Sequence, residues 1–357
     1  MSFQSSSTSS TDKSNLQDSW LDAWYGARRW TLWLLPVMWL FIALSTLRRF
    51  FILRYQQKRL PTPVVVVGNI SVGGTGKTPL IIAIVKWLQQ QGYNPGVVSR
   101  GYGGKAPEYP YLLTAQSTAA ESGDEPLAIF QKTGAAIVVG SDRIASGKVL
   151  EDQGCDILLS DDGLQHYRLG RDIEIAVVDG IRGVGNGWRL PVGPLREPAS
   201  RLKTVDWVVV NSPAENFALP VIDGETIFYA SMQIKPGELI QLKTGNIISR
   251  TELPDTINAV AGIGNPERFV NTLRELNFVP HLQAFPDHFS FTFSDLDFKN
   301  SMPVVMTEKD AVKCRSFAQD NWFYLPVTAE LPASFWQAFG QKLERVSAQQ
   351  KSRFPLR

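Results

Sequence analysis

Acidic residues are absent from a long stretch near the N-terminus: no Asp or Glu lies between Ala23 and Pro107. The same stretch carries eleven Lys or Arg residues, although the 357-residue chain has a formal net charge of only +2. A region without acids favours anionic partners such as lipid headgroups, phosphates or nucleic acid. The chain also lacks a motif of aromatic residues interleaved with basic ones, so a nucleic-acid partner is not expected.

Cysteine is scarce as well, which excludes a fold held together by several disulfides and one built around a cysteine-ligated zinc ion. The two cysteines, Cys155 and Cys314, provide neither a disulfide framework nor the spacing of a zinc site. We expect both to be small buried hydrophobes in a reducing compartment. With 20% charged and 44% hydrophobic residues the chain is expected to fold, except for a disordered tail over residues 1–19, which is rich in Ser, Thr and Gln.

One long apolar run stands out against this background. Residues 30–47 are uncharged, contain three Trp residues, and are bracketed by arginines. A helix of this length would span about 27 Å, slightly less than the hydrocarbon core of a bilayer. Three interpretations remain open: a short membrane-spanning helix, a helix in the membrane interface, or a buried helix of a soluble domain. The denser basic residues after the run place the main body on the cytoplasmic side.

Further along, the pattern becomes that of an α/β fold with a parallel, doubly wound sheet. Buried-strand patterns alternate with helical ones; the strands are expected at 64–67, 96–99, 136–139, 156–160, 173–178 and 207–210. Residues 227–242 alternate around Lys235-Pro236-Gly237, which predicts a β-hairpin or a ribbon between two lobes. Strands at 257–262, 303–307 and 322–327 predict a second, smaller α/β unit. The expected division is a tail at 1–19, a membrane-associating segment at 20–60, a P-loop domain at 61–220, and a ribbon with the smaller domain at 221–345.

The strongest motif is a glycine-rich loop between the first strand and a helix expected at 79–91. Its members are Gly73, Gly74, Thr75, Gly76, Lys77 and Thr78. Glycines let backbone N–H groups surround phosphate oxygens. Lys77 places a positive charge next to the β- and γ-phosphates, and Thr78 offers a hydroxyl to Mg²⁺. Ser71 stands where the usual pattern has Gly, which is tolerable if its φ is negative. The sequence therefore predicts an ATP site with Mg²⁺.

A P-loop enzyme also needs a carboxylate for its Mg²⁺, usually after a neighbouring buried strand. Asp161 and Asp162 follow such a strand, and either could coordinate the metal directly. For a general base the candidate is Asp124, at the start of a helix, where it could equally be an N-cap. His166 and His288 are both possible partners, and spacing alone does not choose between them.

Several motifs together resemble the tetraacyldisaccharide 4′-kinase family of the lipid A pathway. They occur in order between residues 64 and 314, and are GNISVGGTGKTP, VVSRGYGG, SGDEP, DDGLQH, GNGWRLPVGPLREP, AGIGNP, DHF and MTEKDAVKC. The resemblance implies transfer of the ATP γ-phosphate to the 4′-hydroxyl of an acylated glucosamine disaccharide 1-phosphate, giving lipid IVA. It also implies an enzyme at the membrane lipid surface, on the cytoplasmic face of a Gram-negative inner membrane.

The resemblance further implies roles for individual residues. Lys77 would bind phosphate, and Thr78 with Asp161 or Asp162 would hold Mg²⁺. Asp124 would act as the base with His288 as its partner in a dyad. The periphery of the site would be formed by Glu125, Arg143, Gln165, Arg196 and Glu197.

Two alternatives remain at this stage. One is a soluble small-molecule P-loop kinase, and the other is a membrane-anchored nucleotide switch that changes protein partners. Val72 argues against one switch family, which carries a lysine at that position of its loop.

Overall fold

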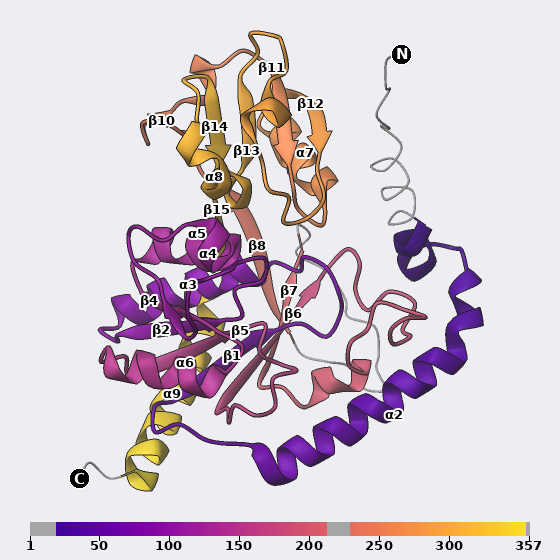
Figure 1. Cartoon of the computed structure of the whole chain (residues 1–357), viewed down its shortest axis with the longest axis vertical. Coiled ribbons are helices and arrows are strands. Elements are labelled where there is room, and N and C mark those ends of the chain that lie inside the picture. Colours follow the sequence, from indigo (N-terminus) through magenta and orange to yellow (C-terminus); the bar gives the residue numbers. More distant parts are fainter. Residues whose placement is uncertain (1–18, 213–228, 355–357) are drawn as a thin grey trace.

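The computed structural model describes residues 19–212 and 229–354, so nearly all of the expected N-terminal tail lies outside the described residues. Two sheets form two lobes, and Figure 1 shows the smaller lobe standing above the larger one. The expected fold class, a mostly parallel doubly wound sheet with a smaller α/β unit and an apolar N-terminal helix, is confirmed.

The larger sheet has the strand order β15-β8-β7-β6-β1-β5-β2-β4-β3. Its parallel strands are β1 (Val64–Gly68), β2 (Pro95–Ser99), β4 (Ala136–Val139), β5 (Ile157–Asp161), β6 (Ile173–Asp179), β7 (Trp207–Asn211) and β8 (Ala230–Pro236). The edge strands β3 (Tyr111–Leu112) and β15 (Val327–Glu330) are antiparallel to their neighbours. The carboxyl ends of β1, β5 and β2 therefore meet at one edge, where open α/β sheets bind ligands.

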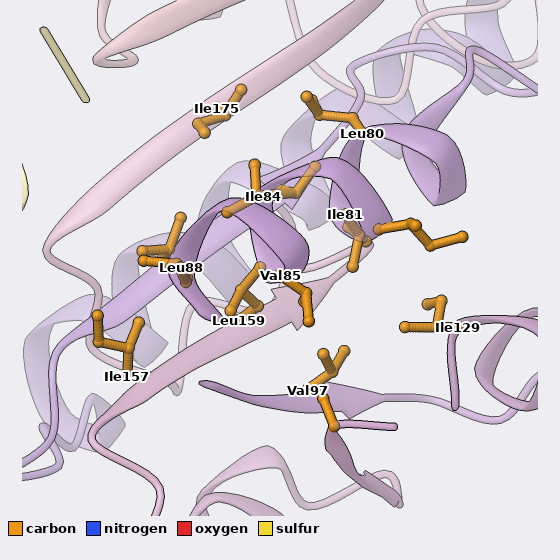
Figure 2. Packing of buried hydrophobic residues seen from close by; sticks show 14 of the residues in the cluster. Leu80, Ile81, Ile84, Val85, Leu88, Val97, Ile129, Ile157, Leu159 and Ile175 are labelled. Carbon is orange, nitrogen blue, oxygen red and sulfur yellow. The ribbon is translucent and has the colours of Figure 1, made fainter. Parts of the chain in front are cut away.

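Helices cover both faces of this sheet. One face carries α3 (Lys77–Gln90), α5 (Asp124–Thr133) and the C-terminal α9 (Ala333–Arg353), with the short α4 (Ala119–Ser122) before α5. The other face carries α6 (Arg143–Asp152) and the 3-10 helix η3 (Ala199–Lys203). In Figure 2 the side chains of Leu80, Ile84 and Leu88, which recur at helical spacing along α3, lie against Ile157, Leu159 and Ile175 of the sheet.

The smaller sheet has the order β10-β9-β14-β13-β11-β12. Its strands are β9 (Leu239–Gln241), β10 (Ile247–Ile248), β11 (Thr256–Ala261), β12 (Val279–Ala284), β13 (Val304–Thr307) and β14 (Trp322–Leu325). Its helices are α7 (Pro266–Glu275), α8 (Glu308–Cys314) and the 3-10 turns η4 (Arg250–Glu252), η5 (Phe293–Leu296) and η6 (Arg315–Phe317). Cys314 is buried in this lobe and Cys155 in the larger one, and both are free thiols.

The expected hairpin at 227–242 is wrong in its pairing. β8 pairs with β7 and β15, whereas β9 pairs with β14 and β10. The chain leaves the large sheet at Pro236 and returns at Val327, and the Gly237 amide donates to the Pro326 carbonyl at 2.9 Å. The ribbon between the lobes is therefore β8 with β15, as Figure 1 shows.

The expected division at residue 220 also differs from the sheet arrangement. β8, β15 and α9 all belong to the larger lobe although they lie beyond that residue. Phe335 and Phe339 of α9 are buried in the same core as Leu88 of α3. Alternation predicted β-structure around β8, whereas β15 and α9 were not predicted; periodicity also could not assign β8 to a lobe, because it carries no information on pairing partners.

The apolar run forms a peripheral helix. It comprises η1 (Trp30–Leu34), α2 (Leu35–Phe51) and the π-helical turn η2 (Ile52–Gln56). By length and composition it could cross a membrane, and only 11% of its most apolar window is buried. The interpretation as a buried helix is therefore wrong. In Figure 1 α2 runs along the outer edge of the larger lobe.

Candidate active site

The glycine-rich loop joins β1 to α3 at the ligand-binding edge of the large sheet. Lys77 is the first residue of α3, so its ammonium lies near the helix N-terminus together with the N–H groups of the first turn. Lys77 Nζ lies 3.5 Å from Asp162 Oδ1, and the Lys77 side chain is mostly buried. The predicted loop therefore places Lys77 beside Asp162 of the predicted acidic pair, and its N–H groups and ammonium could bind an anion.

Two positions of the loop require glycine. Gly76 has a φ of 93°, and a Cβ there would lie 2.4 Å from Asn211 Nδ2. Gly73 has a φ of 106°, also in the region that side chains avoid. Ser71, which departs from the usual pattern, is not among the described residues with positive φ, so the hydroxymethyl side chain is compatible with the loop.

The two adjacent acids have different surroundings. Asp161 ends β5 and is buried; its Oδ2 accepts from Ser99 Oγ at 2.9 Å, while its Oδ1 has no hydrogen-bond partner. Burial and the neighbouring Glu125 and Asp162 raise the pKa of Asp161 to about 6. Asp162 has a φ of 47° and pairs with Lys77 and, at 2.9 Å, with Arg196.

These surroundings fit a Mg²⁺ ion better at Asp161 than at Asp162. The Oδ1 atoms of both acids are buried without a hydrogen-bond partner, but that of Asp162 lies 3.5 Å from the Lys77 ammonium, whereas that of Asp161 has no ion-pair partner in the described part of the chain. A buried carboxylate oxygen of this kind is costly unless a cation or donor joins it. Among the described residues no cluster of three or more His, Cys, Asp or Glu side chains could hold a metal. A site with one or two protein ligands, completed by phosphate oxygens, is the usual arrangement for Mg²⁺.

The proposed base and one histidine meet across the two lobes. Asp124 is the first residue of α5 and is only 4% exposed. Its Oδ1 lies 2.9 Å from His288 Nδ1. His288 belongs to the loop after β12 and has a φ of 60°. A positive φ at a residue other than glycine persists where the surrounding structure fixes it, and such residues are more frequent at functional sites. Tyr102 packs its ring against that of His288, with centroids 4.9 Å apart.

The electrostatics of this pair favour an ionised carboxylate. Burial raises the pKa of Asp124, but the hydrogen bond from His288 and the charges of Lys309 and Lys313 outweigh burial and hold it below its usual range. The hydrogen bond to Asp124 raises the pKa of His288, against burial and the charge of Lys309. The pair is therefore arranged to keep Asp124 as a proton acceptor.

The other two histidines lie elsewhere. His166 lines a separate cavity with Nε2 3.3 Å from the Ser141 carbonyl, and burial lowers its pKa. His281 is exposed on β12, the edge strand of the smaller sheet. Only His288 contacts Asp124 among the three.

The peripheral residues divide between two places. Glu125 pairs with Lys309 at 3.0 Å beside Asp124. The other four lie around a cavity of about 970 Å³ that opens beside Asp162, and they are Arg143, Gln165, Arg196 and Glu197. Arg143 donates to the Asp161 carbonyl at 2.9 Å, and burial lowers its pKa to about 10. Gln165 donates to Glu197 at 2.7 Å.

Arginines give this cavity its character. The lining includes Arg48, Arg49, Arg100, Arg143, Arg168, Arg189 and Arg196, against the acids Asp142, Asp162 and Glu197. Residues Phe41, Leu44 and Ser45 of α2 form one wall. The cavity is thus lined by cationic side chains from both lobe and helix, since Arg48 and Arg49 belong to α2, with apolar side chains of that helix beside them.

The smaller lobe also approaches the phosphate loop. A Cβ on Gly264 would lie 3.4 Å from the Gly74 nitrogen. Arg268 of α7 donates to Asn211, which in turn donates to the Thr75 carbonyl at 3.0 Å. Contacts from the smaller lobe therefore support both the phosphate loop and the Asp124–His288 pair.

Sequence reasoning missed several of these groups. Lys309 and Lys313 lie in the motif MTEKDAVKC, which carried the resemblance without an assigned role. Tyr102 was likewise part of VVSRGYGG. Asn211 and Arg268 gave no signal, because their importance comes from contacts between elements far apart in the chain.

Comparison with known proteins gives a consistent result. The family model described as Tetraacyldisaccharide-1-P 4′-kinase matches residues 30–344. A tetraacyldisaccharide 4′-kinase from Colwellia psychrerythraea is 50% identical over 305 residues, which cover 83% of this chain and 87% of that one. A tetraacyldisaccharide 4′-kinase from Aeromonas salmonicida is 49% identical over 328 residues, which cover 90% of this chain and 95% of that one. The crystal structure of LpxK from Aquifex aeolicus in complex with ATP has a TM-score of 0.69 at 24% identity, covering 88% of this chain and 99% of that one.

Proposed function

We propose that the site between the two lobes phosphorylates the 4′-hydroxyl of a tetraacylated glucosamine disaccharide 1-phosphate, because this chain belongs to the tetraacyldisaccharide 4′-kinase family. ATP is the phosphoryl donor, and the product is lipid IVA in the lipid A pathway. The observation that carries the assignment is the contact between Asp124 and His288, which brings a proton acceptor to the same edge of the fold as the phosphate loop.

The nucleotide site follows from the loop and Lys77. Backbone N–H groups at the start of α3 and the Lys77 ammonium bind the β- and γ-phosphates. Thr78 and Asp161 are the proposed Mg²⁺ ligands, because the buried Oδ1 of Asp161 has neither a hydrogen-bond nor an ion-pair partner among the described residues, whereas the carboxylate of Asp162 pairs with Lys77 and Arg196. When bound, Mg²⁺ would neutralise charge on the β- and γ-phosphates. Asp162 instead orients Lys77 and Arg196.

The acceptor side uses Asp124. A sugar hydroxyl is a weak nucleophile, so a carboxylate within hydrogen-bond reach helps by orienting it and accepting its proton. His288 holds the carboxylate in place through Nδ1. The phosphoryl-transfer transition state is loose, so most of the catalytic effect comes from positioning and charge neutralisation, which Lys77 supplies.

The cationic cavity is the proposed site for the anionic disaccharide headgroup. It opens beside Asp162, and its arginines match a phosphate in charge and in hydrogen-bond geometry. Since α2 forms one wall, acyl chains leaving the headgroup can pass over the apolar face of that helix. The headgroup and the nucleotide would thus meet from opposite sides of the acidic pair.

The peripheral helix is the proposed membrane contact. A stripe at helical spacing faces the protein, and its members are Met38, Phe41, Ser45, Arg49 and Ile52. Arg49 lies over the Tyr167 ring at 4.9 Å and 3.8 Å from Glu197. Because these contacts attach the helix along its length, we favour an interfacial position over a membrane-spanning one, on the cytoplasmic face of the inner membrane.

Removing exposed tryptophans from this helix should weaken membrane binding. Trp33 is 89% exposed and Trp39 is 62% exposed. Burial of a large apolar side chain stabilises by about 1.5–3 kcal/mol, so Trp33→Ser with Trp39→Ser should bind vesicles at least about 100-fold more weakly. The measurement is sedimentation with vesicles of phosphatidylethanolamine and phosphatidylglycerol.

The matched control removes two exposed apolar side chains from the smaller lobe. Ile247→Ser with Val279→Ser should leave vesicle binding unchanged, because these residues lie away from α2. Equal loss of binding in both double variants, or in neither, would count against α2 as the membrane contact.

The function itself is tested by lipid phosphorylation. Detergent-solubilised protein is incubated with γ-labelled ATP, Mg²⁺ and tetraacyldisaccharide 1-phosphate, and the label is followed into the extracted lipid. Labelled lipid that depends on both substrates, and that stops when EDTA is added, is the expected result. Hydrolysis of ATP by folded protein without labelled lipid would refute the proposed function and favour a nucleotide switch.

A further inference from the structure

Helix α8 of the smaller lobe directs two lysines at the proposed base. Lys309 and Lys313 are one helical turn apart, and their ammonium groups lie 3.9 Å and 3.7 Å from Asp124 Oδ2. Lys313 also pairs with the fully buried Asp310 at 2.8 Å. A short helix that brings two buried cations to one carboxylate is an expensive arrangement unless the carboxylate stays charged.

Lys309 contacts every polar member of the cluster. Its Nζ lies 3.0 Å from Glu125 Oε1, 3.0 Å from Asp287 Oδ1 and 3.4 Å from His288 Nε2. Glu125 belongs to the larger lobe, whereas Asp287 and His288 belong to the smaller one. Lys309 therefore joins the two lobes at the point where the dyad forms.

The chemistry of these partners leaves one neutral form of His288. A lysine ammonium only donates hydrogen bonds, so His288 Nε2 must accept if it bonds to Lys309. The Asp124 carboxylate only accepts, so His288 Nδ1 must carry the hydrogen. Both bonds are satisfied together only when His288 is protonated on Nδ1 and bare on Nε2.

We infer that Lys309 is a positioning residue for the phosphoryl transfer, and that it acts at His288 Nε2, where its ammonium disfavours a second proton and so keeps the ring a neutral Nδ1–H donor to Asp124. This inference rests on the proposed role of Asp124 as base. Lys309 is absent from the lining of the cationic cavity and touches no residue of the phosphate loop among the described contacts. Its effect should accordingly fall on turnover and not on the binding of ATP.

The charged groups around the ring agree with this role. Those that face it are Asp124 and Glu125 from α5, Asp287 from its own loop, and Lys309 and Lys313 from α8, with Tyr102 packed on the ring. Burial alone would lower the pKa of Lys309, but the Glu125, Asp124 and Asp287 carboxylates raise it, so this ammonium keeps its charge. Loss of that charge should make both Asp124 and His288 easier to protonate.

The tautomer can be read directly in the full-length protein. The chain has three histidines, so ¹⁵N-histidine labelling and long-range ¹H–¹⁵N correlation give few signals, and His288→Asn identifies that of His288. At a pH above the titration of the ring, wild-type His288 should show a protonated Nδ1 and a bare Nε2. In Lys309→Met the Nδ1–H bond to Asp124 should remain, but Nε2 should gain its proton at a pH about 1 unit higher than in the wild type, and an unchanged Nε2 titration in Lys309→Met would overturn the inference.

Kinetics provide the second readout. Lys309→Met should lower kcat about 10- to 100-fold, as loss of a partner that orients a functional histidine does. KM for ATP should stay within about twofold, and the acid limb of kcat/KM should move up by about 1 pH unit, because removal of a cation raises the pKa of a neighbouring acid. Lys309→Arg keeps the charge and should recover part of kcat.

The matched control is Lys132→Met. Lys132 of α5 also joins the lobes, through Glu308 of α8 at 2.7 Å, and it donates to the Val327 carbonyl of its own lobe at 2.6 Å, but no described contact links it to the dyad. It should leave the pH profile and the titration of His288 Nε2 unchanged. An equal fall in kcat in both variants, with the same pH profile, would show that Lys309 only holds the lobes together.

Failure of the inference is distinguishable from failure of the proposed base. An active Asp124→Asn enzyme would remove the base assignment, and with it the role given to Lys309. An inactive Asp124→Asn enzyme with an unaltered titration of His288 Nε2 in Lys309→Met would keep the base and remove only the inference.

Discussion

Asp124→Asn should lower kcat about 10²- to 10⁴-fold, the range that general acid–base groups contribute. The amide has the shape of the carboxylate but cannot accept the proton of the sugar hydroxyl. ATP affinity should change little, because Asp124 lies outside the phosphate loop. The measurements are lipid phosphorylation over a pH series and ATP binding by calorimetry; the variant should also lose the acid limb of the wild-type profile.

The buried environment of Asp124 requires a check on folding, because the amide leaves Lys309 and Lys313 facing a neutral group. Thermal unfolding of the variant gives that check. Asp320→Asn is the matched control, since Asp320 pairs with Lys243 on the exposed surface of the smaller lobe. An Asp124→Asn protein that is folded and as active as Asp320→Asn would exclude Asp124 as the base.

Lys77→Met should lower kcat/KM for ATP by about 10²- to 10³-fold, the cost of removing one positioned donor to developing negative charge. The effect should appear in both KM and kcat, because the ammonium contacts phosphate oxygens in the bound nucleotide and in the transition state. Loss of Lys77 also leaves Asp162 with Arg196 as its remaining ion-pair partner in the described structure. Initial rates over an ATP series separate the two constants.

Lys86→Met is the control for this change. Lys86 lies on the same helix α3 but is exposed on its outer side. Its loss should alter neither constant, which separates a local phosphate contact from a general effect of charge on α3. A Lys77→Met enzyme with the kinetics of Lys86→Met would mean that the glycine-rich loop does not bind the reacting phosphates.

The parts of the fold that sequence predicts well are those that depend on local pattern. The run Val64–Val67 reads as a strand because β-branched residues buried on both faces suit a central parallel strand, and it became β1. The loop with Lys77 and Thr78 reads as a phosphate site because its chemistry depends on neighbours in the chain. Ala136–Val139 matches β4 at both ends for the same reason.

The parts that sequence could not predict depend on pairing over long distances. Asp124 and His288 are separated by 164 residues, and nothing local in either motif reveals that they meet. Alternation around Pro236 predicted a hairpin, but β8 pairs antiparallel with β15, which follows the whole smaller lobe in the chain. Tertiary pairing overrides local pattern at such positions because several strands compete for each edge.

The return of the chain at Pro326 also bears on the order in which the protein folds during synthesis. The smaller lobe is an insertion in the larger domain, entered at Gly237 and left at Pro326, with its two ends in hydrogen-bond contact. The strand and helix that complete the larger core, β15 and α9, follow the whole inserted lobe in the chain and are synthesised after it. The inserted lobe can fold while the host domain still lacks Phe335 and Phe339, so the nucleotide site gains its full support only once the chain beyond that lobe has been made.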